Sequence, residues 1–214
     1  KSTMNNRTQN KIQITQTIIR AASVYKSKMV GYSFLYVFED RCIEVIYRAK
    51  DFMHLTGVDS DLSATAFYRE AVRGRLRHNQ IYFSQRHPYD LCVRKINQLQ
   101  NISAVTDSDI LILEDLTTDT FTYKFGLTEL NFTLCLKADT DYFGNTVSDK
   151  YVARSLRSED SVPRSSDAYE VHYIFAKRND ERFYNDLRYI DERYEISNLP
   201  EEILNKIDDT LLNK

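Results

Sequence analysis

The stretch CIEVIYRAKDFMHLTGV, residues 42–58, is the segment around which the rest of the chain is interpreted. Its first six residues are rich in β-branched and aromatic side chains, which predicts a strand. Residues 52–57 form a short apolar turn that ends at Gly57, where a left-handed backbone or the close approach of another segment is easy. His54 and Thr56 place an imidazole and a hydroxyl in this turn, directly after a strand. Such a position suits a catalytic group and equally a helix cap.

Length and composition are those of one soluble globular domain covering residues 1–214, with 42% hydrophobic and 28% charged residues. No apolar run approaches the roughly 20 residues of a membrane helix. The polar start KSTMNNRTQNK lacks the apolar centre of a secretory signal. Cys42, Cys92 and Cys135 are widely spaced within apolar runs. This favours buried free thiols in a reducing compartment over a disulfide or a metal set.

The formal net charge of -2 hides a segregation of charge along the chain. Residues 1–50 carry nine Lys or Arg and three acids, and residues 69–95 carry seven and two. Residues 101–149 carry two Lys or Arg and nine acids, and residues 179–214 carry five and ten. Either these charges mix as solvated faces, or the early basic residues form a surface for phosphates.

The order of the predicted elements indicates an α+β fold, with N-terminal helices packed on an antiparallel β-sheet and a C-terminal helix. The predicted helices cover residues 7–28, 64–78, 89–100 and 200–213. The predicted strands cover residues 32–38, 42–47, 110–113, 121–125, 130–136, 150–156, 169–176 and, more weakly, 183–190. Residues 138–149 are predicted to be a polar loop.

Basic residues recur every four positions in the predicted second helix, at Arg69, Arg73 and Arg77. On a helix this spacing forms one positive stripe. The stripe is either a solvated face or a surface that contacts nucleic acid.

Motifs that bind phosphates, dinucleotides or metals are absent from the sequence. It contains no P-loop, no G-x-G-x-x-G, no G-x-S-x-G and no H-E-x-x-H. Its four histidines have no C-x-x-C or close histidine partner, and its acidic clusters lack the other features of a calcium loop. We therefore predict that any chemistry proceeds without a bound metal or an organic cofactor.

Two early segments, EVIYRAKDFMHLTGV at residues 44–58 and FYREAVRGRL at residues 67–76, carry a resemblance to a known family. They resemble the phage Barnase–EndoU–colicin–RelE-like nucleases, small domains of phages and mobile elements. The similarity is to the subgroup with a signature close to F-x-H-L-T-G.

Later segments are similar to the same subgroup. YVARSLRSED at residues 151–160 resembles its P-x-S-(L/F)-R element, although Ala153 stands where the family has Pro. VHYIFAKRND at residues 171–180 resembles its I-F-x-K strand, and YNDLRY at residues 184–189 resembles its Tyr-x-x-(Leu/Ile)-x-Tyr segment. The resemblance covers residues 32–190.

The resemblance implies a fold and an activity. The core, residues 32–190, would hold RNA on the concave face of an antiparallel sheet of about four strands, flanked by helices 7–28 and 200–213. Members of the wider fold cleave RNA without metal, by activating the ribose 2′-OH to attack the adjacent phosphate. The protein would act in the cytoplasm of the host cell of a phage or mobile element.

The resemblance also suggests roles for particular side chains. His54 would be a general acid or base. Arg154, Arg157 and Lys177 would hold phosphate, Thr56 and Ser155 would donate hydrogen bonds, and Tyr189 would donate a proton or stack a base. Arg69, Arg73 and Arg77 are further candidates for contacting nucleic acid. Each of these residues also has an ordinary structural explanation, as a cap, a strand residue or a surface charge.

Two hypotheses about function follow. The first is a metal-independent endoribonuclease of a mobile genetic element, acting as a toxin or effector, and it requires His54, Arg157 and Lys177 to face one cleft. The second is a non-catalytic binding protein, an inhibitor or adaptor, whose acidic residues 101–149 face a basic, nucleic-acid-handling protein partner.

Overall fold

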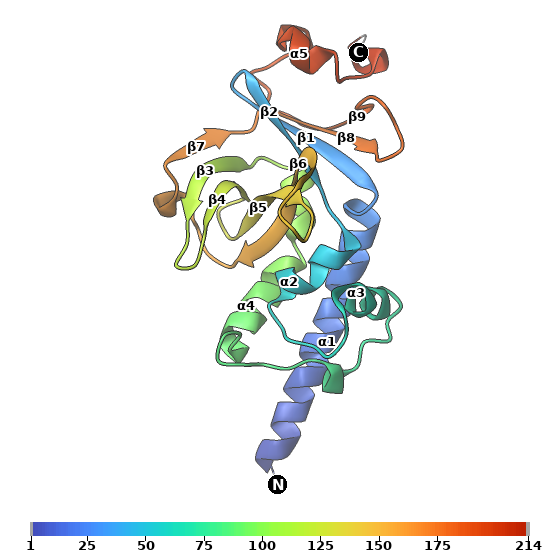
Figure 1. The fold of residues 1–214 in the computed structure, drawn as a ribbon, viewed down its shortest axis with the longest axis vertical. Helices are drawn as coiled ribbons and strands as arrows, with labels where there is room; N and C mark the ends of the chain where they lie inside the picture. Colours follow the sequence, from blue (N-terminus) through green and yellow to red (C-terminus); the bar gives the residue numbers. More distant parts are fainter. Residues whose placement is uncertain (1, 213–214) are drawn as a thin grey trace.

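Four helices, α1 to α4, lie on one side of a nine-stranded sheet in the computed structural model, which describes residues 2–212 (Figure 1). The helices are α1 (Ser2–Lys28), α2 (Phe52–Thr56), α3 (Ala64–Val72) and α4 (Tyr89–Leu99). The α+β prediction is confirmed.

The sheet joins two antiparallel groups of strands. The strands are β1 (Tyr32–Phe38), β2 (Arg41–Ile46), β3 (Leu111–Thr117), β4 (Thr122–Thr128), β5 (Thr133–Thr140), β6 (Thr146–Arg157), β7 (Asp167–Glu170), β8 (Tyr173–Arg178) and β9 (Asp186–Ile190). Their order is β7-β3-β4-β5-β6-β2-β1-β8-β9. The β2–β6 pair is parallel, with Val45 opposite Tyr151, whereas the other pairs are antiparallel. The sheet is therefore larger than the four strands expected.

Two large hydrophobic cores cover the two faces of the central strands, and a third, smaller cluster contains Leu113, Leu116 and Cys135. Alternate residues of the central strands, such as Phe34 and Ile174, pack with α1 to α4 in the main core. The residues between them, such as Leu35 and Phe175, pack against the C-terminal segment, including α5 (Glu201–Leu204) and α6 (Asp209–Leu212). Each strand side chain is thus assigned to one face by its position in the alternation.

The predicted second helix ends earlier than expected. Helix α3 begins at the Ser63 cap, whose side chain accepts a hydrogen bond from the Ala66 amide, but it ends at Val72. Gly74 follows with a φ of 68°, which turns the chain out of the helix. Arg77 therefore lies outside α3, and the prediction of one stripe of three arginines is wrong.

The prediction of one continuous C-terminal helix over residues 200–213 is also wrong, because the structure has two short helices, α5 and α6, in this region. The chain breaks between α5 and α6 because the Tyr184 amide donates to the Lys206 carbonyl and the Asp208 amide donates to the Tyr184 carbonyl. These hydrogen bonds compete with the helical ones. The end of the prediction, residue 213, lies outside the described residues.

Two other segments differ from the sequence prediction. The strand predicted over residues 169–176 is two strands, because β7 pairs with β3 at one edge of the sheet while β8 pairs with β1. The predicted loop 138–149 is largely strand, since β5 continues to Thr140 and β6 begins at Thr146. Asp141 closes the turn between them by accepting hydrogen bonds from the amides of Phe143 and Asn145.

The turn between β2 and α2 is anchored by Arg48. Its guanidinium donates to Asp51 at 2.7 Å and to Asp139 at 2.6 Å. The side chains of Asp51 and Asp139 are only 10% and 5% exposed. The Arg48 carbonyl accepts a hydrogen bond from the Tyr25 hydroxyl of α1. Arg48 therefore fixes α2 relative to both the sheet and α1.

Replacing Arg48 with methionine is expected to destabilise the fold by about 3 kcal/mol, because it leaves two buried carboxylates without a cation. Urea unfolding followed by circular dichroism measures this change. The matched control is Arg41→Met, since the Arg41 side chain is 44% exposed and its partner Glu114 keeps a second cation, Lys124, at 2.9 Å. This control should cost about 1 kcal/mol or less. Equal losses in the two variants would contradict the anchoring role of Arg48.

Candidate active site

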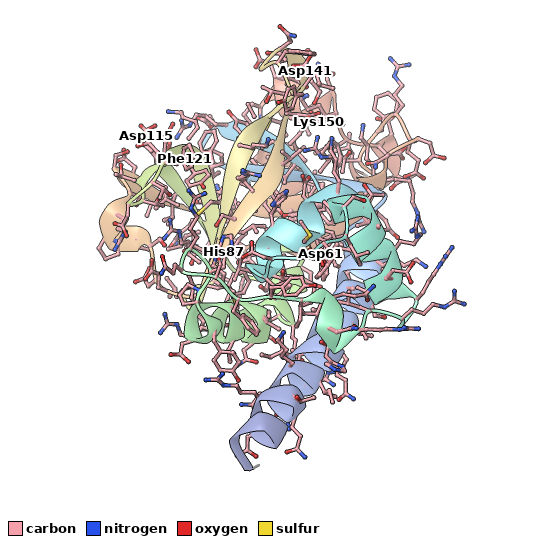
Figure 2. All side chains as sticks on the ribbon, turned by 60° about the horizontal axis from the view of Figure 1, so that its bottom comes forward. Asp61, His87, Asp115, Phe121, Asp141 and Lys150 are labelled. Atoms are coloured by element: carbon pink, nitrogen blue, oxygen red, sulfur yellow. The ribbon has the colours of Figure 1, made fainter. Side chains whose placement is uncertain are left out.

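A cleft of about 780 Å³ opens where α2, α4 and the end of β6 meet the β3–β4 connection. His54 and Gly57 of the α2 turn form one part of its wall, and Lys95 of α4 forms another. Arg157 lines it from β6. Figure 2 labels two further lining residues, His87 just before α4 and Phe121 on the β3–β4 connection.

In the HLTG turn, residues 54–57, the His54 side chain is exposed, whereas the Thr56 side chain makes hydrogen bonds within the turn. Thr56 is fully buried, and its hydroxyl donates to the Met53 carbonyl at 2.7 Å and accepts from the Val58 amide at 3.2 Å. The Thr56 hydroxyl thus closes the turn and does not line the cleft, whereas the exposed His54 does.

Gly57 allows α4 to approach this turn. Its φ of 76° lies in the left-handed region, and its carbonyl accepts a hydrogen bond from the Cys92 thiol at 3.3 Å. A β-carbon at this position would lie 3.0 Å from Cδ of Lys95. Glycine at this position therefore lets the Lys95 side chain pass over the turn and reach the cleft.

A β-bulge in β6 sets the directions of its polar side chains. Ser155 lies opposite Cys135 and Ala153 lies opposite Leu136, so that Arg154 is an extra residue on its strand. Ala153 and Leu156 face the main core. Arg154 is exposed, and it lines the cleft together with Ser155 and Arg157. Bulges commonly re-aim side chains in this way.

The cleft is rich in cations that have no carboxylate partner. Among residues 2–212, no ion pair is formed by the five basic residues that line it, which are Arg86, Arg94, Lys95, Arg154 and Arg157. Two carboxylates line the same walls, and one of them, Asp119, pairs with Arg164 at 3.1 Å. Such an excess of unpaired positive charge favours binding of an anion.

Arg157 and Lys95 are the most enclosed of these cations. Nε of Arg157 is buried and has no hydrogen-bond partner in the described structure. Burial, together with the positive charge of Arg157, lowers the pKa of Lys95 from its ordinary value. An anion between them would relieve their repulsion and supply the missing hydrogen-bond acceptor.

The two imidazoles of the cleft have different surroundings. Although His54 is exposed, the walls remove part of its hydration and lower its pKa, and the neighbouring Arg154 lowers it further. His87 instead pairs through Nδ1 with the Asp59 carboxylate at 2.8 Å. Burial alone would raise the pKa of Asp59, but hydrogen bonds from Ser84 and His87 lower it. The ring of His87 is thus held by a carboxylate, whereas a neighbouring cation opposes protonation of His54.

One protein family matches most of the chain. The model of the family described as phage-Barnase-EndoU-ColicinE5/D-RelE like nuclease4 matches residues 17–193. The chain belongs to this nuclease family. A search of curated proteins and a search of solved structures each found no significant match.

A nuclease family suggests a nucleic-acid substrate, and the excess of cations in the cleft is compatible with one. Among the described residues, no group of three or more His, Cys, Asp or Glu side chains is placed to hold a metal ion. In residues 2–212 no helix combines the length and the apolar character needed to cross a membrane.

Two residues that the nuclease resemblance suggested lie away from the cleft. Lys177 of β8 donates to the Arg182 carbonyl at 2.9 Å and lies over the Tyr184 ring, on the face of the sheet that packs against the C-terminal segment. Tyr189 of β9 lies opposite Ile174 and packs against the main core. The structure thus brings His54, Arg154, Ser155 and Arg157 together, and the expectation that Lys177 joins them is wrong.

The arginines near α3 also lie outside the cleft lining. Arg69 pairs with Glu70 at 3.3 Å, and Arg73 and Arg77 are exposed. Four of the nine acidic residues of segment 101–149, namely Glu114, Asp115, Asp119 and Asp139, form ion pairs within the described structure. Glu114 pairs with Arg41 and Lys124, and the Asp139 and Asp119 carboxylates are engaged by arginines as described above.

Sequence reasoning missed the half of the cleft contributed by α4 and the segment before it. Arg86, His87, Arg94 and Lys95 line the cleft, but they form no recognised motif. The excess of basic residues in segment 69–95 was the available signal. All four residues lie in this segment, and three of them are Lys or Arg.

Proposed function

We propose that the protein is a metal-independent endoribonuclease that cleaves RNA by attack of a ribose 2′-OH on the adjacent phosphate. The observation that carries this proposal is the convergence of His54 and His87 with five unpaired cations in one cleft. This set supplies proton transfer and stabilisation of negative charge, the two requirements of the reaction. It offers few carboxylate oxygens, whereas Mg²⁺ prefers oxygen ligands.

His54 acts as the general base. Because its pKa is lowered, the imidazole is neutral near pH 7 and can accept the proton of the 2′-OH. The 2′-oxygen then forms a bond to phosphorus, and the bond from phosphorus to the 5′-oxygen breaks. The products are a 2′,3′-cyclic phosphate and a 5′-hydroxyl.

His87 acts as the general acid. The Asp59 carboxylate holds Nδ1 of His87, so that Nε2 remains available to donate a proton to the departing 5′-oxygen. The contact with Asp59 also fixes the orientation of the His87 ring. Tyr189 was expected to supply this proton, but the position of His87 in the cleft makes it the better candidate.

The cations of the cleft hold the phosphate and neutralise the charge that develops on it. Arg157 and Arg154 donate from β6 and Lys95 donates from α4, on the opposite wall. Guanidinium groups match two phosphate oxygens at once. Ser155, between the two arginines, supplies a further hydrogen bond. Lys95 thereby takes the phosphate-binding role that was expected for Lys177.

The biological role that fits this activity is that of a toxin or effector of a phage or mobile element, acting on RNA in the host cytoplasm. Support comes from the phage affiliation in the family description.

Product analysis tests the proposed chemistry. A single-stranded RNA is incubated with the protein in excess chelator, and the new ends are identified by mass spectrometry. We expect 2′,3′-cyclic phosphate and 5′-hydroxyl ends, and no cleavage where the nucleotide 5′ to the scissile phosphate carries 2′-deoxyribose. Cleavage that persists at that 2′-deoxyribose position, or no cleavage of any RNA, would overturn the proposal.

The acid side of the pH–rate profile is expected to move when Arg154 is replaced with glutamine. Removal of a neighbouring positive charge favours the protonated imidazole, so the pKa of His54 rises and activity is lost at a higher pH on acidification. The measurement is kcat/KM against pH between about 5 and 8. Arg73→Gln, on an exposed surface outside the cleft lining, should leave the profile unchanged. If the fall in kcat/KM at acidic pH stayed at the same pH or moved to lower pH, the effect of Arg154 on the pKa of His54 would be contradicted.

A further inference from the structure

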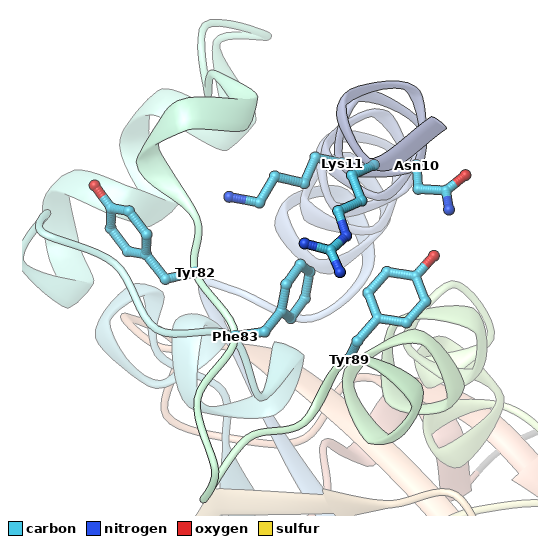
Figure 3. A pocket seen from close by; sticks show the side chains of 6 residues that line it. Asn10, Lys11, Tyr82, Phe83 and Tyr89 are labelled. Carbon is cyan, nitrogen blue, oxygen red and sulfur yellow. The ribbon is translucent and has the colours of Figure 1, made fainter. Parts of the chain in front are cut away.

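A second pocket of about 540 Å³ lies between α1 and the segment that leads to α4. It is lined by Arg7, Asn10, Lys11, Tyr82, Phe83 and Tyr89. Figure 3 shows Lys11 extending from α1 toward Tyr82, with Phe83 between the two tyrosines. The pocket thus combines aromatic rings and cations, and no carboxylate of the described residues lines it.

The rings of this pocket are exposed and held in place. Tyr82 and Tyr89 are each 38% exposed. The Tyr82 hydroxyl donates to Asp61 at 2.5 Å, and the Tyr89 ring meets Phe83 edge-on, with 5.1 Å between their centroids. Lys11 donates to the Ile81 carbonyl at 2.9 Å, which holds its ammonium 5.4 Å from the centroid of the Tyr82 ring. Rings fixed in this way lose little conformational entropy when a flat ligand stacks on them.

One residue connects this pocket to the cleft. The backbone of Asp59 exchanges hydrogen bonds with that of Tyr82, at 3.1 and 2.8 Å, and the side chain of Asp59 holds His87. His87 lies five positions after Tyr82 in the chain, so that about 18 Å is the longest distance between them. A tight turn between Ser84 and His87 shortens it, and Arg86 within this turn lines the cleft. A few nucleotides of a single strand can therefore reach from the cleft to the pocket, with a cation on the way.

We infer that this pocket is a nucleobase subsite, which binds a base of the single-stranded RNA whose phosphodiester lies in the cleft. This inference rests on the proposed function. Stacking of bases on aromatic side chains, with cations nearby for the phosphates, is how single strands are bound without sequence readout. The subsite favours unpaired RNA over a duplex, because a base can enter it only when it is free of its partner.

Binding of a non-cleavable strand tests the subsite apart from the chemistry. The probe is a fluorescent oligonucleotide of about eight nucleotides with 2′-deoxyribose throughout, and a dinucleotide of the same kind is the short reference. We expect Tyr89→Ala to weaken binding of the long probe about tenfold and to leave binding of the dinucleotide unchanged. Tyr89→Phe, which keeps the ring, should bind like the wild type. Tyr142→Ala, which removes a ring that is 97% exposed on the β5–β6 turn, should also bind like the wild type.

The possible failures are distinguishable. If Tyr89→Ala and the wild type bind the long probe equally tightly, the subsite is refuted while the nuclease proposal stands. If Tyr89→Ala weakens binding of the dinucleotide by the same factor as binding of the long probe, the Tyr89 ring affects binding in the cleft itself. The subsite is then again refuted. If the wild type binds neither probe and cleaves no RNA, the subsite and the proposed function fall together.

Discussion

Replacing His54 with glutamine is expected to lower kcat/KM for RNA by about a hundred- to ten-thousand-fold, the range for loss of a general acid or base. Glutamine retains a polar side chain of similar length but cannot accept the 2′-OH proton near pH 7. No hydrogen bond of the imidazole holds the fold together in the described structure, and the residue is exposed. Its replacement should therefore change the free energy of unfolding by about 0.5 kcal/mol or less.

The measurement is the rate of cleavage of a defined single-stranded RNA in chelator, with thermal unfolding recorded for every variant. His78→Gln is the matched control, because His78 lies outside the cleft, in the short helix His78–Gln80. It should retain wild-type activity. For the wild type, kcat/KM should fall on acidification with an apparent pKa below the ordinary pKa of histidine, about 6.5, because the pKa of His54 is lowered. Full activity in His54→Gln would exclude His54 as the base.

Replacing Arg157 with alanine is the second change with a large expected effect, a loss of about a hundred- to a thousand-fold in kcat. Arg157 is one of the two most enclosed cations of the cleft, and its buried Nε has no hydrogen-bond partner in the described structure. Its interaction with phosphate should be strongest when negative charge builds up at the pentacovalent stage. Loss of this group therefore affects the chemical step more than ground-state binding.

Single-turnover rates at saturating enzyme isolate this step. Arg157→Lys should fall between the wild type and alanine, since an ammonium keeps the charge but not the two-pronged hydrogen bonding. Arg164→Ala is the matched control because Arg164 is already paired with Asp119 beside the cleft. If Arg164→Ala lost as much activity as Arg157→Ala, a general loss of positive charge would explain both variants. The specific role of Arg157 would then be rejected.

The elements with clear local signals could be predicted from the sequence. The β-branched and aromatic residues at the start of segment 42–58 correctly predicted β2, and the helix predicted over residues 89–100 agrees closely with α4. Errors arose where tertiary contacts override local pattern. Tyr184 breaks the C-terminal helix through backbone hydrogen bonds. The alternation of Tyr169, Val171 and Tyr173 with polar residues continues without a break. It therefore conceals the point where the chain passes from β7, paired with β3, to β8, paired with β1.

The candidate site could be predicted on the side that carries a motif, and not on the other. His54, Arg154, Ser155 and Arg157 lie in segments that resemble the nuclease family, and they share the cleft. The position of Lys177 was predicted wrongly, because the sequence does not show which face of β8 is covered by the C-terminal segment. Lys95 could not be assigned, since only the close packing of α4 on Gly57 brings it to the cleft.

The most direct test of a single phosphate site is an NMR titration of the His54 ring with and without inorganic phosphate. If His54, Arg154, Arg157 and Lys95 surround one anion, phosphate should raise the pKa of His54 in a saturable manner, because the anion favours the imidazolium. In Arg157→Ala the rise should be much smaller at the same phosphate concentration. A pKa of His54 that does not respond to phosphate, or that responds equally in Arg157→Ala, would contradict the convergence of these groups on one phosphate.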